Sequence, residues 1–167
     1  FEAGWSAATH WVIDEHRTAA GDALLPGTGY LELAAEALDA HGESGPFEIR
    51  DLSFLRPLTV ADETRRRVRV RLARSDEGYR LEVRGDVAAD GRAGFELNAQ
   101  ATLALPAPPA PPPLDLAAIA ARCRRHTFAG SGGILASPPE AHLRFGPRWR
   151  VLKGIALGDG EGLAMLR

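Results

Sequence analysis

The chain has 167 residues, of which 45% are apolar and 25% charged, and its net charge is -2. This composition is typical of a soluble globular domain, and so small a net charge does not draw a protein to nucleic acid or to an anionic membrane. No apolar run approaches the roughly 20 residues that a membrane-spanning helix needs. The single cysteine, Cys123, excludes an internal disulfide framework and fits a reducing compartment. We therefore expect a cytoplasmic domain that binds neither nucleic acid nor membrane.

The first strong signal is a helix over residues 28–40. Thr28 is its predicted N-cap, and His41-Gly42 is its predicted end. Apolar residues recur through this segment at helical spacing. Their main stripe is Leu31, Ala34, Ala35 and Leu38, which Tyr30, Leu33 and Ala37 widen. A helix with so broad an apolar surface is expected to be covered on more than one side.

After this helix the apolar period changes to two. Alternating segments occur at Phe47–Leu55 and at residues 67–72, 79–84 and 95–105. In the last of them Phe95 and Leu97 fall on the apolar face and Asn98 on the polar face. Turn residues separate the segments, including Asp90-Gly91. Strict alternation predicts antiparallel strands with one buried face. One long helix ahead of such strands predicts an α+β fold in which the sheet curls around the helix, the hot-dog arrangement.

The segment Leu105–Pro113 contains six prolines and no polar side chain, which is typical of a semi-rigid spacer. We expect a first unit at 1–105, a linker at 106–113 and the start of a second unit at 114–167. In that second unit we predict a helix within residues 114–125 and a loop at 129–139. Strands are predicted at 151–155 and 162–166. The sequence opens without methionine and stops inside a predicted strand, so we expect it to be a piece of a longer protein.

Residues 10–38 carry a recognisable signature, HWVIDEHRTAAGDALLPGTGYLELAAEAL. It resembles the start of polyketide synthase dehydratase domains, whose motif is His-x3-Gly-x4-Pro. His16, Gly21 and Pro26 take the motif positions, although Gly21 lies five residues after His16 instead of four. Downstream, the segment 145–149 (FGPRW) resembles the Tyr-Gly-Pro-x-Phe segment that opens the second hot-dog of that family. Phe145 stands where the family has tyrosine.

The resemblance implies a double hot-dog whose second unit is incomplete in this chain. It implies a dehydratase of a modular type I polyketide synthase, acting on a 3-hydroxyacyl thioester held by the phosphopantetheine arm of an acyl carrier protein. No metal or other cofactor is implied. The expected partners are the carrier protein and the other domains of the synthase, with a homodimer formed through the parent protein. The residues expected to bind substrate or shape its loops are Gly21, Leu25, Pro26, Gly27, Tyr30, Phe145, Gly146 and Pro147.

His16 is the candidate general base. An imidazole has an unperturbed pKa of about 6.5, close to the working pH, and therefore suits removal of the proton next to the thioester. The thioester carbonyl needs a donor, and a backbone N–H around Gly21 or Gly27 can supply it with help from the helix dipole. The family's second catalytic residue, an aspartate acid, would follow Arg167. The remaining histidines are expected to be ordinary loop or surface residues.

Several alternatives stay open. An enzyme on the same scaffold could close a cyclic ether or shift a double bond, and the domain could instead be a non-catalytic scaffold of its module. The arginines between Arg65 and Arg84 fit a solvated face paired with glutamates, or a docking patch for an acidic carrier protein. Nucleic-acid binding is disfavoured because aromatic residues are not interleaved there. Cys123 and His126 are too few for a zinc site, and residues 130–133 lack the lysine of a phosphate loop.

Overall fold

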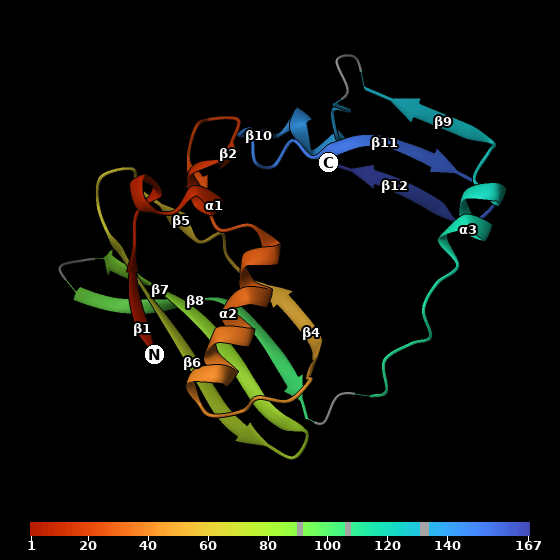
Figure 1. The fold of residues 1–167 in the computed structure, drawn as a ribbon. Helices are drawn as coiled ribbons and strands as arrows, with labels where there is room; N and C mark the ends of the chain where they lie inside the picture. Colours follow the sequence, from red (N-terminus) through yellow and green to blue (C-terminus); the bar gives the residue numbers. More distant parts are fainter. Residues whose placement is uncertain (90–91, 106–107, 131–133) are drawn as a thin grey trace. The chain divides into compact units, whose positions relative to one another are not determined.

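The computed structural model describes residues 1–89, 92–105, 108–130 and 134–167 (Figure 1). The chain divides into two units, residues 1–109 and 110–167. The division falls in the proline-rich segment, whose residues 106 and 107 lie outside the described residues. So do the predicted turn at Asp90-Gly91 and positions 131–133 of the predicted loop. Within the described ranges, no helix is long and apolar enough to cross a membrane.

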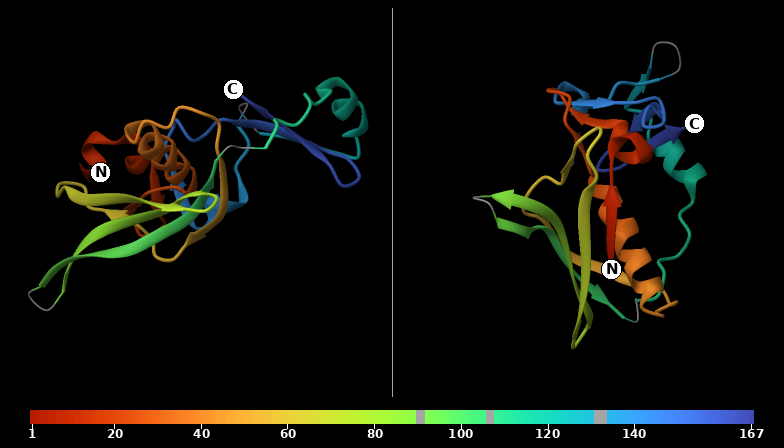
Figure 2. Two further views of the ribbon diagram at one scale, coloured as in Figure 1. Left: turned by 90° about the horizontal axis from the view of Figure 1, so that it is seen from below. Right: turned by 90° about the vertical axis from the view of Figure 1, so that its left-hand side faces the viewer.

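The first unit combines one long helix with an antiparallel sheet. The strands of this sheet run in the order β1-β6-β7-β8-β4, and a second small group pairs β2 with β3 and β3 with β5. Figure 2 shows the long strands along one side of α2. The elements are β1 (Glu2–Trp5), α1 (Trp11–Asp14), β2 (His16–Thr18), β3 (Ala23–Leu24), α2 (Gly27–Ala40), β4 (Glu48–Phe54), β5 (Thr59–Val60), β6 (Arg66–Ser75), β7 (Gly78–Ala89) and β8 (Arg92–Ala104).

The core of the first unit lies between α2 and the sheet. The helix contributes Tyr30, Leu33, Ala34, Ala37 and Leu38, and the sheet contributes Val68, Val70, Tyr79, Leu81, Val83, Ala99, Ala101 and Leu103. Burial of these apolar side chains is the main driving force that holds the helix on the sheet. The predicted hot-dog arrangement, a sheet packed along one long helix, is confirmed.

Two details of α2 differ from the prediction. The helix begins at Gly27 with Pro26 as its N-cap, so Thr28 is not the cap. Pro26 is extended, with ψ 156°, and the backbone is already helical before Thr28 is reached. The buried stripe is also displaced, because Leu31 is 42% exposed while Tyr30 and Leu33 are buried. The helix ends as predicted, with His41 as C-cap and Gly42 at φ 89°.

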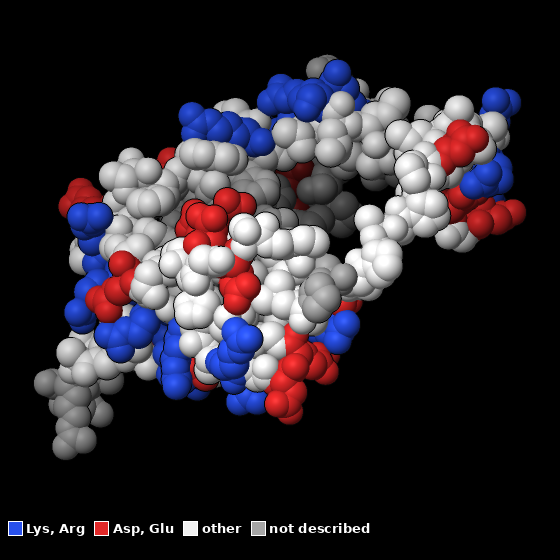
Figure 3. All heavy atoms as spheres, turned by 60° about the horizontal axis from the view of Figure 1, so that its bottom comes forward, with Lys and Arg blue, Asp and Glu red and all other residues white. Residues whose placement is uncertain are grey.

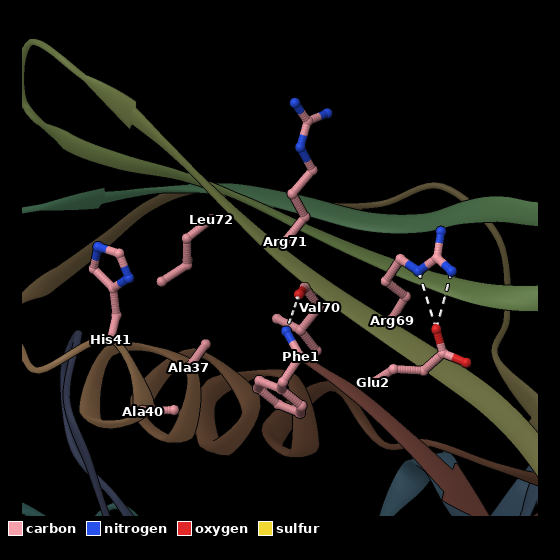
Figure 4. Close-up of a pocket in the computed structure, with 9 residues that line it drawn as sticks. All are labelled: Phe1, Glu2, Ala37, Ala40, His41, Arg69, Val70, Arg71 and Leu72. Carbon is pink, nitrogen blue, oxygen red and sulfur yellow. Dashed lines mark hydrogen bonds and ion pairs between the residues drawn. The ribbon is translucent and has the colours of Figure 1, made fainter.

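Strand β6 alternates as predicted. Figure 4 shows Leu72 pointing toward α2 and Arg71 pointing to the opposite side of the sheet. On that outer side Arg69 pairs with Glu2 at 3.0 Å, and Arg84 pairs with Glu82 at 3.1 Å. Basic and acidic side chains are likewise interspersed on the face displayed in Figure 3. These contacts favour the interpretation of a solvated surface whose charges are paired.

Strand β8 departs from the predicted alternation at Asn98. Val83 of β7 pairs with Ala99, whereas the next residue, Arg84, pairs with Leu97. Asn98 is therefore an extra residue, a β-bulge that bends the strand locally. The prediction that its side chain faces water is wrong, because Asn98 is fully buried.

The bulge also changes the face on which the start of β8 presents its side chains, because one extra residue reverses the alternation. The ring of Phe95 lies among the outer arginines and not in the core. The guanidinium of Arg69 lies 3.9 Å from the ring centroid and that of Arg67 lies 5.3 Å from it. The expectation that no aromatic residue is interleaved with these arginines is therefore wrong.

Both ends of the buried Asn98 amide are hydrogen-bonded. The N–H of Gly85 donates to its Oδ1 at 2.6 Å, and its Nδ2 donates to the carbonyl of Pro57 at 3.3 Å. The Asn98 carbonyl accepts from the N–H of Leu55 at 2.8 Å and from that of Arg56 at 3.2 Å. Asn98 thus fixes residues 55–57 to the sheet.

The second unit contains α3 (Leu116–Arg122), β9 (His126–Ala129), β10 (Leu143–Phe145), β11 (Leu152–Leu157) and β12 (Gly162–Leu166). The helix and the strands β11 and β12 lie where they were predicted. Strand β9, which was not predicted, completes the antiparallel order β12-β11-β9. The side chain of Asp115 caps α3 by accepting from the N–H of Ala118 at 2.9 Å. Arg122 joins this helix to Glu161 through hydrogen bonds of 2.6 and 2.8 Å.

Replacing Asn98 with alanine should lower the free energy of unfolding by about 1–3 kcal/mol, because it leaves the buried N–H of Gly85 without an acceptor. The measurement is urea unfolding of the chain. Gln100→Ala, an exposed position two residues along the same strand, is the control and should change stability by less than about 0.5 kcal/mol. Equal midpoints for the two variants would contradict a structural role for the bulge.

Candidate active site

His16 is the first residue of β2 and is only 9% exposed. Its Nδ1 lies 3.1 Å from the carbonyl oxygen of Leu24. A carbonyl oxygen can only accept a hydrogen bond, so this contact requires the hydrogen on Nδ1. Neutral His16 then carries its lone pair on Nε2. The local backbone therefore selects the tautomer in which Nε2 is the base.

A tight hairpin joins β2 to β3 directly after His16. The N–H of Thr18 donates to the carbonyl of Asp22 at 2.9 Å, which closes a turn over residues 19–21. Gly21 adopts φ 106°, a backbone conformation that other residues rarely take. The one residue by which this chain exceeds the family spacing lies between His16 and Gly21, in this segment. Gly21 thus shapes the histidine loop through its backbone.

Arg17 braces the same loop. Its guanidinium donates to the Asp14 carboxylate and to the Asp62 carboxylate, each at 2.6 Å. It also donates to the carbonyls of Asp14 and Gly21, each at 2.8 Å. The hydrogen bonds to Asp62 and Asp14 raise the pKa of Arg17 above its usual value. One side chain therefore ties together the segments before and after His16.

A pocket of about 340 Å³ opens beside His16 at the start of α2. It is lined by His16, Leu24, Leu25, Gly27, Tyr30, Phe54, Leu55, Arg56 and Pro57. Four residues predicted for the site, His16, Leu25, Gly27 and Tyr30, are thus brought together. The other two predicted residues of the first unit contribute differently, since Pro26 starts the helix and Gly21 shapes the turn.

The sequence alone did not identify the wall of the pocket formed by residues 54–57. Phe54 is 55% exposed and Leu55 is 48% exposed, unusual values for large apolar side chains in a domain with a well-formed core. The signal that could have found them is the pair Phe54-Leu55 itself, two consecutive apolar residues that a strict alternation cannot bury on one face.

Tyr30 and Phe54 meet in the wall of the pocket. Their ring centroids are 5.1 Å apart, and a Cβ placed on Gly27 would lie 3.3 Å from Cζ of Phe54. The absence of a side chain at Gly27 therefore admits the Phe54 ring to the helix start. Tyr30 is 3% exposed, and burial raises the pKa of its hydroxyl to about 12.

The N–H groups of Gly27 and Thr28 have no acceptor within α2, whereas the N–H of Gly29 donates to the carbonyl of Pro26 at 2.9 Å. Gly27 provides the first of them and lines the pocket. These groups also lie at the positive end of the helix dipole, which favours an oxygen that carries partial negative charge. The pocket therefore combines an imidazole, a wall of mainly apolar side chains that also includes Arg56, and backbone donors.

The remaining predicted site residues belong to the second unit. Phe145 ends β10, and its ring centroid lies 6.3 Å from that of Trp149. The carbonyl of Gly146 accepts from the N–H of Trp149 at 3.1 Å, and the carbonyl of Pro147 accepts from Arg167 at 2.9 Å. These contacts shape a local turn, and a role for Phe145, Gly146 and Pro147 in substrate binding stays a prediction.

The other histidines have structural surroundings. His10 caps α1, and its Nδ1 lies 2.8 Å from the Thr9 hydroxyl. His41 packs edge-on against Tyr79, with ring centroids 5.1 Å apart. Over the residues that the structure describes, no three side chains of histidine, cysteine, aspartate or glutamate gather as metal ligands would.

Comparison with known proteins agrees with this geometry. The profile of the polyketide synthase dehydratase domain matches residues 1–86. This chain belongs to the polyketide synthase dehydratase domain family. Spectinabilin polyketide synthase system protein NorA' of Streptomyces orinoci is 39% identical over 72 residues, which cover 42% of this chain and 2% of that protein.

Solved dehydratases share the fold. The CurJ dehydratase, as an inactive mutant with phenylalanine in place of a histidine, matches with a TM-score of 0.84 and 20% identity over 100% of this chain and 56% of its own. The CurK dehydratase, as an inactive mutant with asparagine in place of an aspartate, matches with a TM-score of 0.78 and 18% identity over 98% of this chain and 56% of its own. The chain thus spans little more than half the length of these dehydratases.

Replacing Arg17 with methionine should lower the free energy of unfolding by about 1 kcal/mol, since its carboxylate partners are largely exposed. Unfolding in low and high salt is the measurement, and salt should shrink the difference from the wild type because it screens the ion pairs. The control is Arg80→Met, an exposed arginine for which the structure records no hydrogen bond or ion pair with the described residues. A loss of unfolding free energy that does not depend on salt would contradict a stabilising role for the ion pairs of Arg17.

Proposed function

We propose that this chain provides the histidine half of the active site of a dehydratase in a modular polyketide synthase. The reaction eliminates water from a 3-hydroxyacyl thioester and gives the enoyl thioester. The substrate is held on the phosphopantetheine arm of an acyl carrier protein, and no metal or other cofactor takes part. The observation that supports this proposal is the hydrogen bond from Nδ1 of His16 to the Leu24 carbonyl, which makes Nε2 the basic atom of a histidine that lines a mainly apolar pocket.

In the proposed reaction, Nε2 of His16 takes the proton from the carbon next to the thioester carbonyl. The electron pair of that C–H bond forms the new double bond, and the bond from carbon 3 to its hydroxyl oxygen breaks. The departing hydroxyl takes a proton from an aspartic acid and leaves as water. That aspartate lies outside the residues of this chain. Return of the proton from His16 to the aspartate restores both groups.

The thioester carbonyl gains negative charge as the proton leaves. The N–H groups at the start of α2, beginning with Gly27, suit this oxygen because they are fixed donors at the positive end of the helix dipole. The inactive CurJ and CurK mutants support the pairing of a histidine with an aspartate, because one histidine is replaced in the first and one aspartate in the second.

Replacing His16 with alanine in the dehydratase domain, with its natural flanking sequence, should abolish formation of the enoyl thioester, because no other base is proposed in the pocket. The measurement is mass spectrometry of a carrier-bound 3-hydroxyacyl substrate before and after incubation. His142→Ala, at an exposed histidine of the second unit, is the matched control and should retain turnover. Full activity of His16→Ala would rule out His16 as the base. A cyclic ether or an alkene with a shifted double bond as the product of the wild-type domain would indicate a cyclase or an isomerase instead of a dehydratase.

We also propose that the outer arginine surface of the sheet receives the acidic carrier protein. Arg67, Arg69, Arg71 and Arg84 line a shallow hollow of about 640 Å³ together with Phe95. Charge complementarity of this kind mainly raises the rate of encounter and depends on salt. The ion pairs with Glu2, Glu82 and Asp86 lower the net charge of the surface but leave the four arginines in excess of the three carboxylates.

Reversing the charge at Arg67 and Arg69 to glutamate should raise KM for a carrier-bound substrate and weaken the dependence of kcat/KM on salt. The same variant should handle a carrier-free pantetheine thioester like the wild type, because the reacting pocket is untouched. Arg124→Glu, at an exposed position of the second unit, serves as the control for a change in net charge. Unchanged kinetics with the carrier-bound substrate would leave only the interpretation of a solvated, charge-paired surface.

A further inference from the structure

We infer that the hydroxyl of Tyr30 donates a hydrogen bond to the carbonyl oxygen of the substrate thioester and acts together with the first N–H groups of α2. This assignment rests on the proposed dehydration and adds a side chain to the set of groups that stabilise the transition state.

The first observation is the hydrogen bonding of the two tyrosines of the chain. Both are buried, at 3% exposure for Tyr30 and 2% for Tyr79. The Tyr79 hydroxyl donates to Glu43 at 2.5 Å and accepts from Arg74 at 2.7 Å. The Tyr30 hydroxyl makes no hydrogen bond with any residue that the structure describes. Among the described residues, the fully buried side-chain atoms without a partner do not include this hydroxyl. It therefore keeps some exposure to the pocket that Tyr30 lines, where it can donate a hydrogen bond to a ligand.

The second observation is where the Tyr30 side chain lies. Tyr30 is three residues after Gly27, so the two positions share one face of α2 a single turn apart. Side chains on a helix lean toward its N-terminus, which directs Tyr30 over the first turn. Phe54 confirms this direction, because its ring contacts both Tyr30 and the position of Gly27. The hydroxyl and the first backbone N–H groups therefore serve the same end of the pocket as His16.

The chemistry of the reaction selects the carbonyl oxygen as the acceptor. The departing 3-hydroxyl needs an acid that gives up its proton, and a buried tyrosine keeps its proton at any ordinary pH. The carbonyl oxygen needs a donor that stays protonated while negative charge develops. A tyrosine hydroxyl beside backbone N–H groups is a common composition for such an oxyanion site. The exposed side chains of Phe54 and Leu55 in the pocket wall would exclude water from it once substrate is bound.

The test compares Tyr30→Phe with Tyr79→Phe in the dehydratase domain with its natural flanking sequence. Tyr30→Phe removes one oxygen atom and keeps the ring contact with Phe54. We expect kcat to fall on the order of 10²-fold with little change in KM, as for the loss of one oxyanion donor. Thermal stability should be unchanged or slightly higher, because the lost hydroxyl had no partner. Tyr79→Phe should show the reverse, a lower Tm with an unchanged kcat, because it breaks the contacts with Glu43 and Arg74.

A Tyr30→Phe domain with the kcat of the wild type would overturn the assignment. A raised KM at constant kcat would overturn it too, because it would place the hydroxyl on a substrate group whose charge does not change in the reaction. A lower Tm that accounts for the whole loss of activity would reduce Tyr30 to a packing residue. If the wild-type domain does not dehydrate the substrate, the proposed function fails, and this result is distinct from an active wild type with an equally active variant.

Discussion

The buried amide of Asn98 joins the sheet of the first unit to the wall of the pocket. Its side chain holds the backbone of Gly85 on one side and of Pro57 on the other, and its carbonyl holds Leu55 and Arg56. The segment 55–57 contributes three of the residues that line the pocket. A segment with exposed apolar side chains has little burial energy of its own, so its position depends on these hydrogen bonds. The bulge in β8 is what makes the amide available, because it turns Asn98 inward.

The opposite side of the pocket is fixed in a similar way, by backbone contacts around His16. The Leu24 carbonyl orients the imidazole, and Arg17 ties the residues before and after the histidine into one loop. Neither contact requires a charged group inside the pocket. Apart from Arg56, the side chains that line the pocket with His16 are mainly apolar, and such surroundings strengthen a hydrogen bond made inside the pocket. A preorganised apolar pocket with a few fixed donors suits a reaction in which charge develops on one oxygen.

The sequence predicted the helix, the long strands and the histidine loop, because each of these depends on local spacing. Periodicity located α2 and β6, and the motif around His16 and Pro26 pointed to the candidate site. The same spacing argument failed at Asn98 and Phe95. A bulge reverses which side chains face the core, and the alternation of apolar and polar residues in the sequence does not show where the bulge lies. The spacing argument also failed for Phe54, because alternation predicts a strand but does not show which residues the end of that strand will contact. Contacts between distant segments, such as that of Gly85 with Asn98, are set by tertiary structure and not by local propensity.

The glycines of the PGTG segment have a physical explanation in the packing at the start of α2. A Cβ at Gly27 would press on Phe54, and a Cβ at Gly29 would lie 2.6 Å from Cδ1 of Leu25, closer than any side chain can tolerate without movement. Both glycines therefore permit the pocket residues on either side to approach the helix backbone. This close approach leaves the first N–H groups of α2 near the pocket, which Gly27 lines. The motif thus encodes access to the helix terminus, and the conformational cost of two glycines in the first turn is offset by the contacts of Leu25 and Phe54.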